Sequence, residues 1–376
     1  MTTVPHLLID CTSVGVRVTG IERYEREVGG RLARLKAQEG WRVTVLMSRS
    51  ARTHLADWVA KVAESAAVLE SPFASRVLTQ QAWIPHVARH RRADAGFFAS
   101  FPPSPLVFAL RGGRFRVVRT MHDAVLWSSP ETTSLKNTLY FGPLERWGAE
   151  RYALVHTVSS HARDDILRHV PTLSDRIVVS GGGVSSLPPP APDALARLGI
   201  RVPFLLTVGT LEPRKNLPFL LRVFDRFRQE RSDLQLVLAG RFGWGAAEVE
   251  RIVAELGLAN RIVLTNAITD ADLAALYQEA QALLFPSLHE GFGLPLVEAM
   301  SAGLPVVSAD VTSMPEVCGD AALMVPPSDA EQWLAAMRAV TTDSALRKQL
   351  AERGRVRAAA FSWDQVAARV AASIVA

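Results

Sequence analysis

Two glutamates and a glycine-rich turn lie together in the stretch HEGFGLPLVEAM, residues 289–300. Glu290 is followed directly by Gly291, Phe292 and Gly293, and Glu298 comes eight positions after Glu290. Glycines let a backbone approach a ligand closely, and the free N–H groups at a helix start suit phosphate or an anionic transition state. The third glycine of the dinucleotide-binding fingerprint is absent here. The stretch therefore predicts an anion-binding loop of a different type.

The residues after this turn have helical spacing. Leu296, Val297 and Met300 are predicted to form an apolar stripe, with Glu298 roughly opposite to it and able to face a ligand. A carboxylate accepts two hydrogen bonds side by side, which matches the diol of a ribose. The alternative is an exposed surface glutamate, the ordinary environment of this residue type.

A second stretch, TVGTLEPRKNLPFLL at residues 207–221, places two cations before a helix. The helix is predicted to begin near Asn216, an N-cap residue type, with Pro218 in its first turn. Arg214 and Lys215 would then lie at the positive end of the helix dipole, where cations are disfavoured unless an anion joins them. Phosphate is the usual anion at such a place. The alternative is a pair of solvated basic residues in a loop.

Other acidic and histidine patterns are weaker. Asp270 and Asp272 form a D-x-D triplet, a pattern that holds a divalent metal in another fold. Thr269 precedes them as an N-cap type, so helix capping explains both carboxylates without a metal. The histidines show no metal-ligand spacing. A glycoside hydrolase would need two carboxylates on separate elements facing across a bond, whereas Glu290 and Glu298 share one loop and helix.

The elements that position these residues alternate between strands and helices. Alternating short apolar runs and helical patterns imply parallel sheets covered on both faces, an α/β fold. A Pro-rich break at residues 186–203 separates two such series, so two doubly wound domains with a ligand-binding cleft between them are expected. The predicted strands are residues 6–11, 41–48, 95–100, 116–121, 154–159, 176–180, 204–209, 234–240, 261–265, 282–287, 305–309 and 323–327.

Composition is consistent with two globular domains. The chain has 376 residues, 48% of them hydrophobic and 21% charged. Through Pro189 there are 24 Lys and Arg against 16 Asp and Glu, so the first half is basic and the second is not. A basic half indicates an anionic surface or substrate or a solvated Arg-rich face, and no nucleic-acid signature is present. Only Cys11 and Cys318 occur, and neither a signal peptide nor a long apolar span is recognised, which favours the cytoplasm.

Taken together, these motifs resemble a known family. The pair Glu290 and Glu298 is similar to the E-x7-E signature of the retaining family-4 glycosyltransferases of GT-B fold, and the resemblance covers nearly the whole chain. GTLEPRKN resembles the donor-phosphate segment, TMHDAVLW the His-Asp segment of the first domain, and HTVSSHARDDI the strand and helix before the linker. TGIERYEREV resembles the first-helix loop of enzymes that build bacterial surface polysaccharides.

The resemblance implies a domain plan and a role for each matching position. It implies a first, acceptor-side Rossmann-like domain at 1–186, a linker at 187–203, a nucleotide-sugar domain at 204–362, and a last helix at 363–376 that packs back on the first domain. This chain departs from the family's pattern at three places. Glu22 stands where glycine is common, either Asn266 or Ala267 stands at a second common glycine position, and GGGV at 181–184 replaces a turn of the Asn-Gly-Val-Asp type. The implied roles are His122 and Glu290 as catalytic residues, Thr210, Arg214, Lys215, Ile268, Gly291, Phe292, Gly293, Leu294 and Glu298 for the donor, and Gly20, Ile21 and Asp123 on the acceptor side.

The expected function is transfer of a sugar, with retained configuration, from a nucleotide-diphosphate sugar to a glycan or lipid-linked acceptor in polysaccharide synthesis. Relatives that build polysaccharides suggest GDP-mannose. Cations and helix N-termini can stabilise the leaving diphosphate, so neither a metal nor another cofactor is expected. The basic first domain would face the inner membrane surface as a peripheral contact, and no nucleic acid partner is expected. The alternatives are a nucleotide-sugar epimerase or phosphorylase on the same fold, or a non-catalytic nucleotide-binding subunit.

Overall fold

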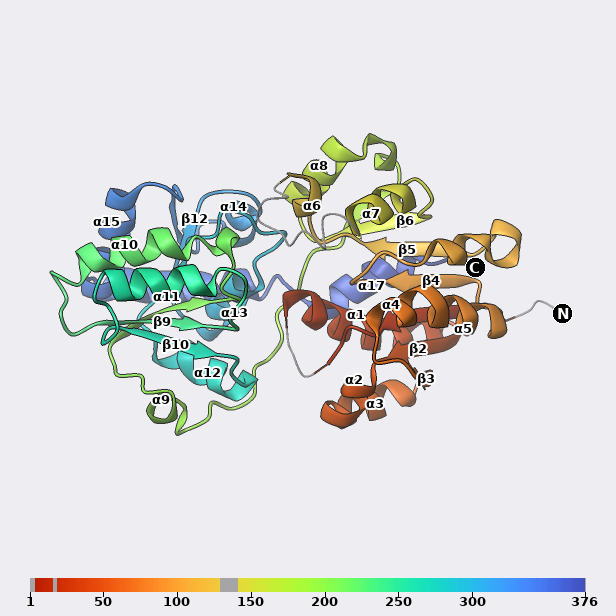
Figure 1. Ribbon diagram of the computed structural model, residues 1–376, viewed down its shortest axis with the longest axis horizontal. Coiled ribbons are helices and arrows are strands. Elements are labelled where there is room, and N and C mark those ends of the chain that lie inside the picture. Colours follow the sequence, from red (N-terminus) through yellow and green to blue (C-terminus); the bar gives the residue numbers. More distant parts are fainter. Residues whose placement is uncertain (1–3, 16–18, 129–140, 376) are drawn as a thin grey trace. The chain divides into compact units, whose positions relative to one another are not determined.

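A computed structural model describes residues 4–15, 19–128 and 141–375 of the chain. The chain divides into two compact units (Figure 1). The first comprises Met1–Gly183 together with Ser362–Ala376, and the second comprises Val184–Phe361. Each unit is a parallel sheet with helices, as the alternation of apolar runs and helical patterns predicts.

The first unit contains a seven-stranded sheet in the order β3-β2-β1-β4-β5-β6-β7. Its strands are β1 (His6–Cys11), β2 (Arg42–Met47), β3 (Ala67–Glu70), β4 (Ala95–Phe98), β5 (Arg116–Thr120), β6 (Leu154–Thr157) and β7 (Ile177–Val179). Its helices, with η for the 3-10 and π-helical segments, are α1 (Gly20–Gln38), α2 (Arg49–His54), α3 (Ala56–Ala63), α4 (Arg76–Leu78), η1 (Thr79–Trp83), α5 (Ile84–His90), η2 (Pro105–Gly113), α6 (Val125–Ser128), α7 (Gly142–Ala149), α8 (Ser160–His169), η5 (Pro171–Leu173) and α17 (Trp363–Ser373).

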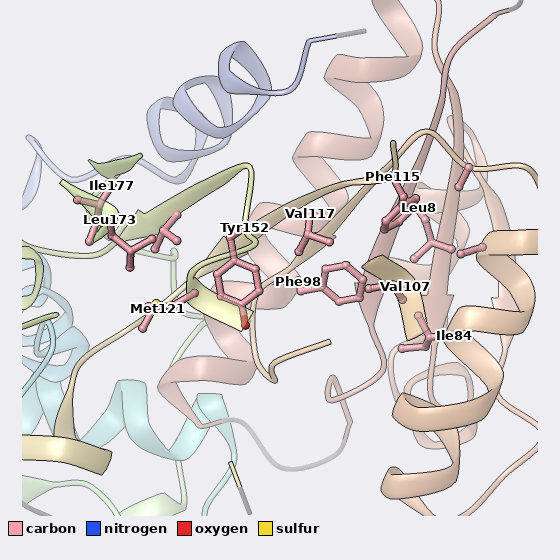
Figure 2. Close-up of a cluster of buried hydrophobic side chains, with 14 of the residues drawn as sticks. Leu8, Ile84, Phe98, Val107, Phe115, Val117, Met121, Tyr152, Leu173 and Ile177 are labelled. Atoms are coloured by element: carbon pink, nitrogen blue, oxygen red, sulfur yellow. The ribbon is translucent and has the colours of Figure 1, made fainter. Parts of the chain in front are cut away.

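The core of this unit lies between the sheet and its covering helices. Figure 2 shows Leu8, Phe98, Val117, Met121 and Tyr152 among the side chains of one buried cluster. Strands buried on both faces need near-continuous apolar runs, and all six residues of β1 are buried. Strand β3 is the one strand that the sequence prediction missed. It is a four-residue edge strand without a fully buried residue, so its sequence lacks a clear apolar run.

The C-terminal helix α17 belongs to the first unit and packs against α1. The ring of Trp363 meets that of Tyr24 edge-on, with 5.6 Å between their centroids. At the other end, the buried ammonium of Lys36 donates to the carbonyl of Ile374 at 2.6 Å. The first unit is therefore built from two segments of the chain, Met1–Gly183 and Ser362–Ala376, which are separated in sequence by the whole second unit.

The second unit contains a six-stranded sheet in the order β10-β9-β8-β11-β12-β13. Its strands are β8 (Phe204–Val208), β9 (Gln235–Ala239), β10 (Ile262–Asn266), β11 (Leu283–Phe285), β12 (Val306–Ala309) and β13 (Leu323–Val325). Its helical segments are α9 (Ala194–Arg197), η6 (Pro213–Lys215), α10 (Leu217–Phe227), α11 (Ala246–Glu255), α12 (Asp270–Glu279), α13 (Leu294–Ala302), α14 (Met314–Cys318), α15 (Ala330–Thr342) and α16 (Ser344–Ala358).

Both sheets are doubly wound, because in each the chain moves outward from its first strand in one direction and then returns to extend the sheet in the other. The reversal falls between β1 and β4 in the first unit and between β8 and β11 in the second. Residues in the predicted linker include helix α9, whose Arg197 pairs with Asp272 of α12 at 2.7 Å. Among the described residues, no helix is long and apolar enough to cross a membrane.

Candidate donor-binding site

The candidate site forms where the second sheet reverses its winding. In open α/β sheets, ligands bind beyond the carboxyl ends of the strands at this switch point. The loop after β8 carries Arg214 and Lys215, and the loop after β11 carries Glu290. The N–H of Leu288 donates to the carbonyl of Arg214 at 2.8 Å, so the two loops are joined through their backbones.

Arg214, Lys215 and Glu290 form a compact ion-pair cluster. The ammonium of Lys215 donates to Oε1 of Glu290 at 2.5 Å, and Nη1 of Arg214 donates to Oε2 at 2.8 Å. A second carboxylate, that of Glu212, accepts from Nε of Arg214 at 2.9 Å. The sequence predicts the two cations and Glu290 as separate features of the site. The structure brings them into direct contact.

Burial makes the cluster electrostatically strong. Burial by itself raises the pKa of Glu290, but the charges of Arg214 and Lys215 outweigh this effect and hold its pKa at about 2. Burial lowers the pKa of Lys215, whose ammonium also lies 4.8 Å from the centre of the Phe285 ring. Glu290 is therefore ionised over the physiological range, and its carboxylate holds both cations at the strand ends.

Local backbone geometry allows Lys215 to reach this position. Gly209 follows β8 with φ of +149°, and a Cβ there would lie 2.9 Å from Cε of Lys215. Only glycine leaves room for the lysine to cross the strand end. Asn216 occupies the N-cap position of α10, as the sequence predicts, but its side chain forms no capping hydrogen bond. Its φ is +55°, and its amide donates instead to the carbonyl of Pro327 at 3.0 Å.

Helix α13 begins directly after the glycine turn. Gly293 takes a left-handed conformation with φ of +95°, which turns the chain into the helix and leaves Leu294 as its first residue. Leu296, Val297 and Met300 are buried, as expected for the predicted apolar stripe, and the burial extends to Glu298 and Ala299 as well. Glu298 is only 6% exposed, which excludes the surface-glutamate alternative, and its Oε2 accepts from the hydroxyl of Tyr277 at 3.0 Å. Tyr277 was not predicted as a site residue.

The predicted base loop lies between β10 and α12, and Ile268 is within it. The next residue, Thr269, forms a capping box with Asp272: its hydroxyl accepts from the N–H of Asp272 at 3.1 Å, and the Asp272 carboxylate accepts from the N–H of Thr269 at 3.1 Å. This confirms the capping explanation of the D-x-D triplet. In the described part of the chain, no group of three or more His, Cys, Asp or Glu residues is arranged to hold a metal.

The predicted acceptor-side residues lie in the first unit. Gly20 and Ile21 open α1, and Ile21 is 41% exposed. His122 and Asp123 follow β5, where Oδ1 of Asp123 accepts from the N–H of Val125 at 3.1 Å.

His122 is held as a neutral ring. Its Nε2 donates to the carbonyl of Ala99 at 2.8 Å, and since a carbonyl only accepts, the proton lies on Nε2 and Nδ1 is an acceptor. Burial, with the positive charge of Arg119, lowers its pKa to about 4. The ring of Tyr24 meets it edge-on at a centroid distance of 4.9 Å. A neutral imidazole here can accept a hydrogen bond but carries no charge at neutral pH.

A buried carboxylate near this histidine was missed in the sequence. Glu25 accepts hydrogen bonds from the hydroxyls of Ser13 and Ser100. Burial, together with the nearby charge of Asp10, raises its pKa to about 8. Ser100 adjoins the Ala99 carbonyl that binds His122, so Glu25 supports that loop from α1. The signal was present, because Glu25 falls at helical spacing on the same stripe as Val28 and Leu32, where an acidic residue is unusual.

Comparison with known proteins identifies the family of this chain. The family described as Glycosyl transferases group 1 matches residues 197–357, and Glycosyltransferase Family 4 matches residues 18–187. The O-antigen chain mannosyltransferase B of Escherichia coli is 34% identical over 260 residues, which cover 66% of this chain and 67% of that protein. The chain belongs to the glycosyltransferases. The GDP-mannose:cellobiosyl-diphosphopolyprenol alpha-mannosyltransferase of Xanthomonas campestris is 28% identical over 202 residues, 53% of this chain and 48% of that protein.

The expected α/β fold of this glycosyltransferase, with two Rossmann-like units of GT-B type, is confirmed. The crystal structure of Anabaena Alr3699/HepE in complex with UDP-glucose matches it with a TM-score of 0.75 and 18% identity, covering 98% of both chains. That likeness shows the fold alone. Alignments with other mannosyltransferases cover between 27% and 59% of those proteins' own length.

Proposed function

We propose that this glycosyltransferase moves mannose, with retained configuration, from GDP-mannose to a hydroxyl of a glycan or lipid-linked oligosaccharide. The observation that carries the proposal is the cluster of Arg214, Lys215 and Glu290 at the β8/β11 switch point. Relatives named as O-antigen and GDP-mannose-dependent mannosyltransferases support the sugar, the donor and the acceptor class.

The chemistry requires stabilisation of a leaving diphosphate. As the bond from the sugar C1 to the phosphate oxygen breaks, negative charge grows on the GDP that departs. Arg214 and Lys215 would offset this charge, together with the N-terminal N–H groups of α13. A new bond forms between C1 and the acceptor oxygen, and in the front-face pathway the acceptor proton passes to the departing phosphate oxygen. Glu290 would keep both cations at the diphosphate, and Glu298 would hold the ribose.

The donor and the stereochemistry can be tested in one experiment. The protein is incubated with GDP-mannose and octyl α-mannoside, and the product is examined by proton NMR for the configuration of the new bond. An α-linked mannoside supports the proposal, whereas a β-linked product refutes retention. Parallel reactions with UDP-glucose and UDP-galactose test the donor. Conversion of a sugar nucleotide to its epimer without an acceptor would instead favour the epimerase alternative.

We further propose a peripheral contact with the inner membrane surface, where a lipid-linked acceptor would be presented. The support is the excess of 24 basic over 16 acidic residues through Pro189, since cationic surfaces bind anionic lipid headgroups. Sedimentation with phosphatidylglycerol vesicles, but not with phosphatidylcholine vesicles, is the expected result. Equal recovery with both vesicle types would contradict it.

A further inference from the structure

Two residues of the loop after β12 contact the backbone of Glu290. The hydroxyl of Thr312 accepts from the N–H of Glu290 at 3.2 Å. The hydroxyl of Ser313 lies within donating distance of two carbonyls, that of Glu290 at 2.9 Å and that of Phe292 at 3.2 Å. Ser313 is fully buried, so water does not compete for these bonds. The N–H and the C=O of Glu290 are thus each bonded by one of two consecutive residues.

Both residues adopt arrangements that local energetics disfavour. Thr312 has φ of +56°, a left-handed conformation that is unusual for a β-branched residue and is found where surrounding contacts enforce it. Ser313 occupies the N-cap position of α14, yet its side chain forms no capping bond to that helix. Its hydroxyl bonds the Glu290 loop instead. Local sequence preference explains neither arrangement, whereas contact with the Glu290 loop explains both.

The order of the strands explains how these contacts hold the Glu290 loop in place. Strand β11 lies between β8 and β12, so the loop that follows β11 has a neighbouring loop on each side. On the β8 side, the backbone carbonyl of Arg214 accepts from the N–H of Leu288 at 2.8 Å. The guanidinium Nη1 of Arg214 donates to the carbonyl of His289 at 3.2 Å. Thr312 and Ser313 hold the other side. The Glu290 carboxylate reaches Lys215 from a backbone that is bonded on both flanks.

We infer that Thr312 and Ser313 are positioning residues of the transferase: their hydroxyls fix the backbone from Glu290 to Phe292, and thereby the carboxylate that orients Arg214 and Lys215. The expected effect on catalysis rests on the proposed function, whereas the expected effect on the backbone of the Glu290 loop does not. Both residues act through the backbone of the Glu290 loop and not through contact with the substrate. Small displacements of catalytic groups lower rates by up to about a hundredfold, so loss of either hydroxyl affects turnover more than fold stability.

Amide hydrogen exchange tests whether the two hydroxyls fix the Glu290 loop, and it requires no sugar-nucleotide substrate. In Thr312→Val the side-chain shape is kept and only the acceptor of the Glu290 N–H is lost, so the amide of Glu290 should exchange at least tenfold faster. Ser313→Ala should speed exchange across residues 290–294, and Thr312→Ser should restore the wild-type rate. The matched control is Ser308→Ala, because Ser308 is also fully buried but its hydroxyl donates to Ala309 at 3.2 Å, away from this loop. Unchanged exchange in both test variants would overturn the inference.

Kinetics with GDP-mannose and octyl α-mannoside measure the catalytic part. Ser313→Ala and Thr312→Val should lower kcat by ten- to a hundredfold with less than a threefold change in the KM for GDP-mannose. Ser308→Ala and Thr312→Ser should stay within twofold of wild type. Equal loss in Ser313→Ala and Ser308→Ala would show a merely structural serine and overturn the inference. If Ser313→Ala does not fold, Thr312→Val against Thr312→Ser carries the test. Wild-type protein that transfers no sugar refutes the proposed function, while hydrogen exchange still tests the two hydroxyls.

Discussion

Replacing Glu290 by glutamine tests the ion-pair cluster most directly. The substitution keeps the size of the side chain and removes the charge that lies 2.5 Å from the Lys215 ammonium and 2.8 Å from the Arg214 guanidinium. A carboxyl pKa lowered from 4.5 to about 2 corresponds to about 3 kcal/mol at neutral pH, since each pKa unit is worth about 1.4 kcal/mol. This agrees with the cost of about 3–5 kcal/mol for removing one partner of a buried pair.

The expected result is a lower melting temperature for the second unit. A loss of about 3 kcal/mol in the free energy of unfolding lowers the transition of a domain of this size by about 6–12 °C. Differential scanning calorimetry of wild type and Glu290→Gln measures it. The matched control is Glu212→Gln, because the Glu212 carboxylate accepts from Arg214 at 2.9 Å but does not pair with Lys215. Its expected cost is below about 1 kcal/mol, as for partly exposed ion pairs.

The stabilisation has a defined pH dependence. Because the pKa of Glu290 is lower in the folded protein, its contribution is fully present above the unfolded value of 4.5 and is lost as the pH falls through about 2. The difference between wild type and Glu290→Gln should therefore be constant from pH 8 to pH 5 and narrow below that. In transfer assays the variant should lose turnover more than donor affinity. A variant that melts within 1 °C of wild type at pH 7 refutes the reasoning.

Three further outcomes follow from the same geometry. Glu298→Gln should weaken GDP binding about tenfold in titration calorimetry, because a buried charged hydrogen bond to the ribose is lost. Tyr277→Phe, which removes the hydroxyl that donates to Glu298, should weaken GDP binding less. Unchanged GDP binding in Glu298→Gln contradicts the ribose assignment. Mannose transfer should persist in excess EDTA, because Arg214 and Lys215 carry the diphosphate charge, and activity lost to EDTA and restored by Mn²⁺ contradicts this. The His122 ring should titrate near pH 4 by NMR, because burial and Arg119 disfavour its protonation; a midpoint above 6 shows that the histidine is not held as described.

Local features of the site were readable from the sequence because they depend on neighbours in the chain. Twelve of the thirteen strands follow from continuous apolar runs, and only β3 lacks such a run. The capping box of Thr269 and Asp272 depends on residues three positions apart, so the D-x-D triplet could be explained before the fold was known. The glycine turn before α13 needs only the left-handed conformation of Gly293.

What the tertiary structure alone decided is which of these local features meet. Lys215 and Glu290 are 75 residues apart, and they form an ion pair only because β8 and β11 are neighbours at the point where the sheet reverses. Side-chain spacing within one helix or strand carries no information about that neighbour relation. The left-handed Thr312 and the Ser313 hydroxyl that leaves its own helix uncapped follow from contact with another loop, against local preference. Glu298 became a buried partner of Tyr277 for the same reason: α13 is enclosed by elements that lie far from it in the sequence.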